Sequence, residues 1–247
     1  MYVNTSVDLK NSVIYAANPY NTDFARRVAF LQTDDTSCSF TCDRTEFIGR
    51  NGTLKKPAAM LNSRLSGKKG VALDPCAAIQ VNFELSAGMG REIIFRLGTG
   101  RDLEDANKTI HRFRGSAPAY AALEAVWQYW NHTLGAVQIE TPEPSINILA
   151  NGWILYQTLA CRVWARTGYY QSGGAFCFRD QLQDVMALIH TKPVLLREHL
   201  LLFASRQFLE GDVQHWWHPP GGKGVRTHCS DDYLWLPLAA CRYVIST

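Results

Sequence analysis

The sequence predicts an α+β protein in which an antiparallel β-sandwich region precedes a series of helices. Up to about residue 115, runs of apolar or alternating residues are separated by glycine-containing turns, which is typical of strands. From Pro118 onward apolar residues recur with helical spacing, and the stretch 141–144 then interrupts the pattern with two prolines. We therefore expect a β-sandwich portion over residues 1–115, a helical linker over 116–144 and a helical region over 145–247.

Strands are expected at residues 13–15, 39–42, 78–85 and 92–97. Each run either is wholly apolar or alternates between apolar and polar residues. Turns at 49–52 and 88–90 contain glycine and favour antiparallel pairing.

Helices are expected at residues 118–134, 147–167, 180–191, 194–210 and 231–245. The last begins at the favourable N-cap sequence 230–232, and Pro237 predicts either a kink or a later start. Because the helical pattern still runs at Thr247, we expect these helices to open a larger helical array.

Composition excludes several classes of protein. The chain has 247 residues, of which 47% are hydrophobic and 19% charged, so it can bury a core. A net charge of +3 without a long Lys/Arg run does not suggest nucleic acid as a partner. The seven cysteines lack Cys-x-x-Cys spacing and favour reduced thiols in the cytoplasm. No apolar run reaches the ~18 residues of a membrane span, so any membrane anchor is expected outside this chain.

Residues 166–184 form the first of three polar and aromatic segments that could take part in catalysis or binding. Asp180 and Asp184 lie four residues apart on one helix face, where they could bind sugar hydroxyls or a metal. The alternative is an N-terminal cap with a surface pair, favoured by the helix dipole.

Residues 211–222 form the second segment and are expected to be a loop. Trp216 and Trp217 beside prolines and glycines suit a platform for sugar rings, and the alternative is core packing. The spacing of His215 and His218 suggests a metal only weakly, because His228 is a loose third candidate.

Residues 226–237 form the third segment, with Asp231 and Asp232 at a helix start. A neighbouring like charge raises the pKa of one carboxyl, as a proton donor requires, whereas the helix N-terminus stabilises the anion. Simple capping is the alternative, and the sequence leaves the protonation of Asp231 open.

Four strings carry a resemblance to a known family. They are DRTEFIGRNG at 43–52, LDPCAAIQ at 73–80, the stretch 156–190 with ARTGYYQSGGAFCFRDQLQD, and the stretch 206–237 with QHWWHPPGG and RTHCSDDYLWLP. Together they resemble the cellobiose and chitobiose phosphorylase family, glycoside hydrolase family 94, and within it the phosphorylase-like region of cyclic β-1,2-glucan synthases. The resemblance covers nearly the whole chain. It implies a portion of a β-supersandwich, a helical linker and the first third of an (α/α)6 barrel.

The resemblance also implies a reaction. In the family, inorganic phosphate attacks the anomeric carbon with inversion while one carboxylic acid protonates the leaving oxygen. Phosphate is already an anionic nucleophile, so no second carboxylate is needed to activate water, unlike in inverting hydrolases. The expected partners are a β-glucan oligosaccharide and phosphate as co-substrate, with no metal or organic cofactor, and family members are often homodimers.

Carried over residue by residue, the family's roles fall on the three segments. Asp231 matches the general acid and Arg166 matches a phosphate-binding arginine. Asp180 and Arg179 are placed around the sugar. The weaker substrate-binding candidates are Asp184, Trp216, Trp217 and Trp235.

The sequence departs from the family in places. The loop 172–176 lacks a sugar-binding arginine, and Cys229 stands where cellobiose-type enzymes have Trp. The family's other phosphate ligands lie further downstream than Thr247, so we expect an incomplete phosphate site. Two other functions stay open: a noncatalytic carbohydrate-binding piece, and an inverting hydrolase that uses Asp231 with Asp180.

Overall fold

The computed structural model describes residues 2–167 and 173–247, and its sheets and helices confirm the predicted α+β class. The chain divides into two compact units, one ending at Glu124 and the other beginning at Ala125. Each unit has buried apolar clusters of its own. Ser172 of the expected glycine-rich loop lies outside the described residues.

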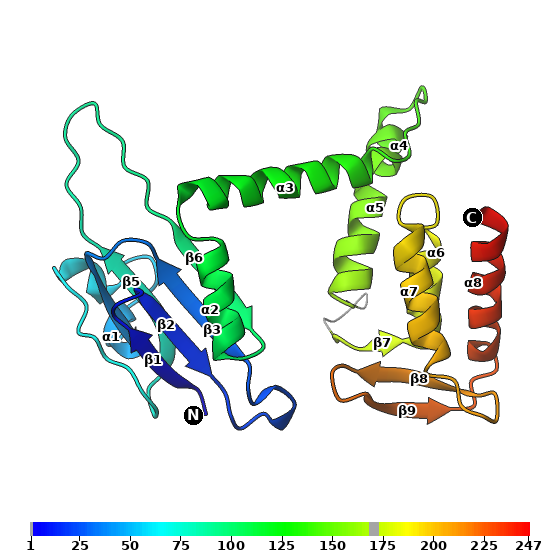
Figure 1. Ribbon diagram of the computed structural model, residues 1–247, viewed down its shortest axis with the longest axis horizontal. Coiled ribbons are helices and arrows are strands. Elements are labelled where there is room, and N and C mark those ends of the chain that lie inside the picture. Colours follow the sequence, from blue (N-terminus) through cyan, green and yellow to red (C-terminus); the bar gives the residue numbers. More distant parts are fainter. Residues whose placement is uncertain (1, 168–172) are drawn as a thin grey trace. The chain divides into compact units, whose positions relative to one another are not determined.

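The first unit contains two antiparallel sheets (Figure 1). The four-stranded sheet has the order β1 (Asn4–Asp8), β2 (Val13–Ala17), β3 (Val28–Thr33) and β6 (Phe95–Gly100). The second sheet pairs β4 (Cys38–Asp43) with β5 (Pro75–Val81). Shorter elements connect them: α1 (Arg44–Ile48) and the 3-10 turns Thr22–Phe24 and Ala58–Leu61.

Strand β2 explains how the layers of this unit form. Val13 and Tyr15 are buried against helix α2 (Leu103–Arg112), whereas Ile14 is buried with Phe40 of β4. Successive side chains of a strand point to opposite faces, so β2 contributes to a core on each side of its sheet. One face of the sheet is covered by α2 and the other by the second sheet.

Two of the predicted strands are displaced along the chain. The strand expected at 92–97 is β6, which begins at Phe95 and pairs with β3 through Gly100. The strand expected at 78–85 is β5, which ends at Val81. Pairing with β3 and β4 sets these limits, and residue periodicity does not contain that information.

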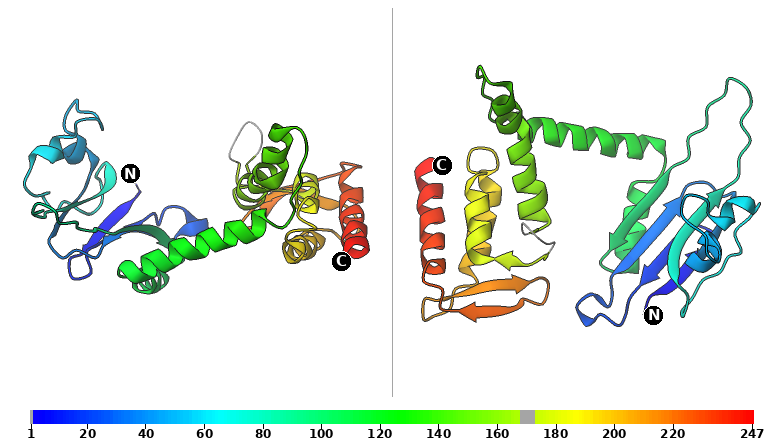
Figure 2. Two further views of the ribbon diagram at one scale, coloured as in Figure 1. Left: turned by 90° about the horizontal axis from the view of Figure 1, so that it is seen from above. Right: turned by 180° about the vertical axis from the view of Figure 1, so that it is seen from behind.

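The second unit is mainly helical. Helix α3 (Ser116–Leu134) crosses the boundary between the units. Helical segments then follow one another, with a kink at Gly152 where the backbone is not helical: α4 (Pro144–Ile148), the π-helical η3 (Leu149–Trp153), α5 (Ile154–Gln157) and the π-helical η4 (Thr158–Trp164). The remaining helices are α6 (Phe178–Met186), α7 (Pro193–Ala204) and α8 (Asp232–Ser246). Figures 1 and 2 show α6, α7 and α8 side by side.

A small antiparallel sheet lies at one end of these helices. It consists of β7 (Phe176–Cys177), β8 (Val213–His218) and β9 (Lys223–Thr227). The prediction of a loop over residues 211–222 was therefore wrong. Val213 and Trp217 on β8 are buried with Phe178 and Phe203, so packing favours a strand here.

Helix ends also differ from the predicted ones. Helix α6 ends at Met186. Turns follow it, one of them closed by a hydrogen bond from Ala187 N–H to the Asp184 carbonyl at 3.2 Å, and α7 then begins at Pro193. Helix α8 starts at Asp232, so Pro237 does not mark a late start. Within residues 2–167 and 173–247, no helix combines the length and apolarity needed to cross a bilayer.

Candidate active site

Two helix N-termini bring the predicted acidic residues together. Arg179 and Asp180 lie in the first turn of α6, and Asp231 immediately precedes α8. The Arg179 Nη1 atom donates to Asp231 Oδ2 at 3.1 Å, across 52 residues of sequence. The same guanidinium contacts Asp180 through Nε at 3.3 Å. Both predicted carboxylates therefore share one arginine.

The cluster continues as a row of alternating charges. Arg162 on η4 lies 3.9 Å from Asp180 and 2.7 Å from Asp184. Burial raises the pKa of the Asp184 carboxyl, although Arg162 acts in the opposite direction. The order along the row is Asp231, Arg179, Asp180, Arg162 and Asp184. Asp184 thus contacts Arg162, a residue that sequence analysis missed.

Asp231 does not cap the helix that it precedes. It occupies the N-cap position of α8, but its side chain makes no capping hydrogen bond. Instead its carboxylate accepts from the Cys229 thiol at 3.0 Å and from Arg179. These donors, Cys229 first, lower the pKa of Asp231 to about 2. The carboxylate is exposed and anionic in this state, and the capping alternative does not describe it.

Arg166 is tied to the loop that follows it. Its Nε donates to the Gly174 carbonyl at 2.9 Å, and its guanidinium lies 4.8 Å from the centre of the Phe176 ring. These described contacts do not include the carboxylates of the charged row. Arg166 keeps its backbone at φ 50°, in the left-handed region.

The three tryptophans differ in position. Trp217 is only 1% exposed and stacks on Phe176, with ring centres 5.3 Å apart, so the prediction that it lines a sugar cleft was wrong. Trp216 is half-buried and makes an edge contact with His218. Trp235 is half-buried beside Asp231 and packs on the same apolar cluster as Trp217.

The second carboxylate of the pair is buried. Asp232 has no exposed surface, and its Oδ2 lies 2.6 Å from Nδ1 of His215. His215 and His218, three residues apart on β8, are not brought together as a ligand pair, because His215 contacts Asp232 whereas His218 lies edge-on to the Trp216 ring. His228 contacts the Tyr233 hydroxyl at 3.3 Å instead.

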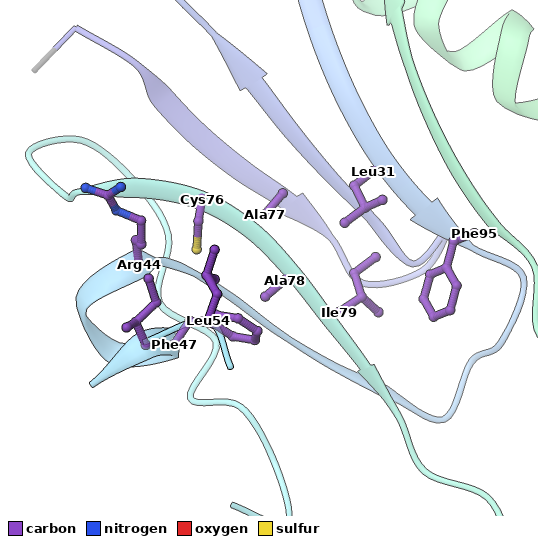
Figure 3. A pocket seen from close by; sticks show the side chains of 10 residues that line it. Leu31, Arg44, Phe47, Leu54, Cys76, Ala77, Ala78, Ile79 and Phe95 are labelled. Atoms are coloured by element: carbon purple, nitrogen blue, oxygen red, sulfur yellow. The ribbon is translucent and has the colours of Figure 1, made fainter. Parts of the chain in front are cut away.

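A pocket of about 520 Å³ lies in the first unit (Figure 3). Its lining is mostly apolar and includes Leu31, Phe47 and Ile79. Arg44 at this pocket pairs with Asp74 at 2.7 Å. Without acidic side chains in its lining, the pocket is not a candidate for acid-assisted glycoside cleavage.

Comparison with known proteins gives matches across the chain. The cyclic beta-(1,2)-glucan synthase of Rhizobium meliloti is 39% identical over 247 residues, which is 100% of this chain and 9% of that protein. The N,N'-diacetylchitobiose phosphorylase of Vibrio proteolyticus is 25% identical over 92% of this chain and 32% of its own length. A 3-O-beta-D-glucopyranosyl-beta-D-glucuronide phosphorylase of Paenibacillus borealis is 26% identical over 85% and 27%, respectively. The chain thus spans about a third or less of these relatives.

Family models divide the chain into two matching regions. The glycosyl hydrolase 94 supersandwich domain matches residues 1–116, and the glycosyl hydrolase 94 superfamily catalytic domain matches residues 129–245. These matches confirm the resemblance drawn from the four sequence strings. The chain belongs to the glycosyl hydrolase 94 family, with its supersandwich domain followed by catalytic-domain sequence.

Proposed function

We propose that this sequence contributes to the inverting phosphorolysis of β-glucosides, with β-1,2-glucan as the substrate. The observation that carries the proposal is that Asp231 and Asp180 both form an ion pair with Arg179. The similarity to a cyclic glucan synthase and to phosphorylases supports the substrate class. Because the chain spans only part of these relatives, the activity is proposed for the full-length protein that contains it.

Each residue of the cluster has a proposed role. Asp231 protonates the departing glycosidic oxygen, and Asp180 with Arg179 holds hydroxyl groups of the sugar. Arg166 attracts phosphate, which attacks the anomeric carbon from the opposite face. Phosphate arrives as an anion, so one acid suffices and no metal or organic cofactor takes part in the reaction.

Asp231 must gain a proton before it can act as the acid. In the ligand-free arrangement the carboxylate is held anionic by Cys229 and Arg179. Sugar hydroxyls and phosphate compete for Arg179, which removes a hydrogen bond from Asp231 and favours its protonated form.

The test uses the full-length protein with β-1,2-gluco-oligosaccharides and inorganic phosphate. The proposal expects phosphate-dependent release of α-glucose 1-phosphate, the product of inversion at a β-linkage. Arg179→Leu should abolish most of this activity, whereas Arg197→Leu, an exposed arginine on α7, should retain it. Cleavage to free glucose without phosphate would identify a hydrolase, and binding without cleavage would identify a noncatalytic module.

A further inference from the structure

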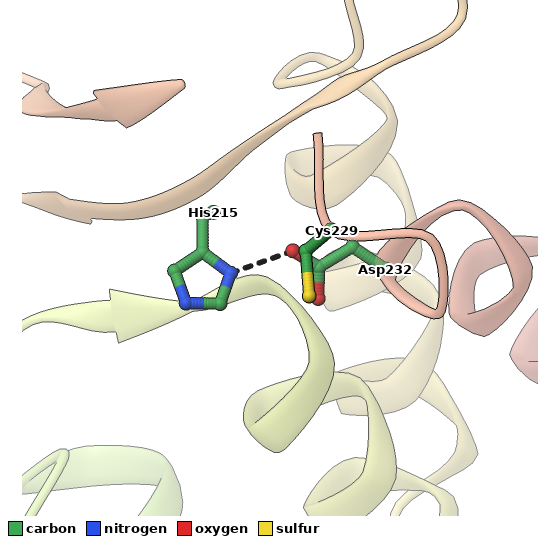
Figure 4. A group of neighbouring side chains, drawn as sticks. All are labelled: His215, Cys229 and Asp232. Carbon is green, nitrogen blue, oxygen red and sulfur yellow. Dashed lines mark hydrogen bonds and ion pairs between the residues drawn. The ribbon is translucent and has the colours of Figure 1, made fainter. Parts of the chain in front are cut away.

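We propose that His215, Cys229 and Asp232 form a binding site for a divalent transition metal of the zinc class. The site adjoins Asp231 but uses different side chains, and the proposed phosphorolysis does not need the metal. Figure 4 shows the imidazole, the thiol and the carboxylate facing one another. One donor atom from each side chain lies within 4.8 Å of the others.

A strand and a tight turn hold these donors in place. His215 projects from β8, which is paired on both sides by β7 and β9. Cys229 and Asp232 flank a tight turn that is closed by a bond from Asp232 N–H to the Cys229 carbonyl at 3.2 Å. The donors therefore converge without any large rearrangement of the backbone.

The buried carboxylate of Asp232 independently points to a ligand. Asp232 is fully buried, and its Oδ1 atom has no hydrogen-bond partner among the described residues. An unpaired buried polar atom destabilises the fold, and more so when it is charged, because it has lost its hydration without gaining a partner. The imidazole of His215 engages only the other oxygen, Oδ2. A cation at this position would be bound by the carboxylate, the imidazole and the thiolate together.

The donor set selects the class of metal. Nitrogen, sulfur and oxygen donors suit zinc, whereas magnesium and calcium prefer oxygen alone. Zinc–ligand distances of ~2.0–2.3 Å in a tetrahedron separate the donors by roughly 3.2–3.8 Å. To reach this size the 2.6 Å contact between His215 and Asp232 has to open, and any pair of donors at the 4.8 Å limit has to close by about 1 Å. A bound thiolate would no longer donate the hydrogen bond from Cys229 to Asp231.

Metal binding can be measured on the chain itself, reduced and freed of metal with a chelator. Competition with a chromophoric chelator should reveal one zinc equivalent, and cobalt should give a thiolate charge-transfer band. Cys229→Ser and His215→Gln should each weaken zinc binding by ~10-fold or more, in line with disrupted metal sites generally. The matched controls are Cys161→Ser, an exposed cysteine, and His218→Gln, an exposed histidine on β8.

Three outcomes would overturn the site. They are a cobalt complex of the unaltered chain without a thiolate band, unchanged zinc affinity in both ligand variants, and equal losses in the two controls. The cobalt spectrum needs no substitution, so it decides the matter even if a variant fails to fold. No sugar or phosphate enters these measurements, so they are independent of the proposed function.

Discussion

Asp231 and Asp232 are neighbours in sequence but lie in opposite environments. The side chain of Asp231 is 45% exposed and faces Arg179, whereas that of Asp232 is 1% exposed and faces His215. Consecutive residues at a helix start point about 100° apart, so adjacent carboxylates need not share a role. The sequence alone could not distinguish the two carboxylates, because their different environments depend on which neighbours the fold packs against each side of α8.

Site residues were predictable only where a family motif contained them. Asp180, Arg179 and Asp231 were expected from the resemblance, and the structure brings them into one cluster. Arg162 was not expected, and His215 was considered only together with His218, because the partners of Arg162 and His215 lie 22 and 17 residues away. The fold creates such pairs, and local spacing does not indicate them.

Asp34 gives a prediction about stability in acid. Burial alone would raise the pKa of this carboxyl, but hydrogen bonds from Arg96 and from the Gly115 N–H lower the pKa below its usual value. A lowered native pKa adds stability above the unfolded value of ~3.9, and this contribution is lost as the pH falls through the native value. The free energy of unfolding should therefore decrease as the pH is lowered past about 4, and this decrease should be smaller in Asp34→Asn.

Urea unfolding of the chain at several acidic pH values measures this effect. Glu84→Gln, which alters an exposed carboxylate, is the control and should follow the unaltered chain. The same acid sensitivity in Asp34→Asn as in the unaltered chain would contradict the assigned role of Asp34.

At the scale of elements, β8 was hidden by its own irregularity. A register shift between Gln214 and Trp216 breaks the two-residue alternation that identifies a strand. Prolines and glycines directly after His218 add a turn signal. The helices were easier to predict because their longer periodic patterns tolerate one irregular position, including Pro237 inside α8.

The packing of β8 predicts different costs for its two tryptophans. Trp217 is fully buried among Phe176 and Phe203, so Trp217→Ala should lower the free energy of unfolding by about 3–5 kcal/mol. Trp216→Ala, at the half-buried neighbour, should cost clearly less. Chemical unfolding followed by circular dichroism compares the two variants. Equal losses of unfolding free energy in the two variants would contradict the different burial of Trp216 and Trp217.

At the scale of the whole molecule, the order of sheet and helix regions was predictable from the change of period along the chain. The division into sheets was not: β4 pairs with β5 across an insertion that contains α1, and β3 pairs with β6 rather than β4. Such non-local pairings depend on which apolar faces fit together. Of the strands in the first unit, the sequence indicated β2, β4, β5 and β6, but neither β1 and β3 nor the partner of any strand.

Because the two units have separate cores, we expect tryptophan fluorescence and circular dichroism to report different unfolding transitions. All seven tryptophans follow residue 124, so their fluorescence reports on the second unit. Arg96, whose side chain is 9% exposed, pairs with Asp34 in the first unit. Arg96→Met should destabilise that unit by about 1.5–3 kcal/mol, because Asp34 loses the hydrogen bonds from Arg96 and keeps the Gly115 N–H and the more distant Arg114 at 3.7 Å.

Thermal unfolding followed by both probes checks this expectation. The circular dichroism transition should broaden and start earlier in Arg96→Met, while tryptophan fluorescence should hardly change. Arg26→Met breaks the exposed pair with Asp102 and should have little effect by either probe. An equal shift of both signals in Arg96→Met would show that the units unfold together.

The most direct test of the central claim compares two substrates in the full-length protein carrying Asp231→Asn. Phosphorolysis of a β-1,2-glucoside needs a protonated leaving oxygen, so it should fall by about 10²–10⁴-fold. Fluoride leaves without such help, so phosphorolysis of β-glucosyl fluoride should be largely retained. Equal losses on both substrates, or no loss on the glucoside, would contradict the role of Asp231 as the general acid.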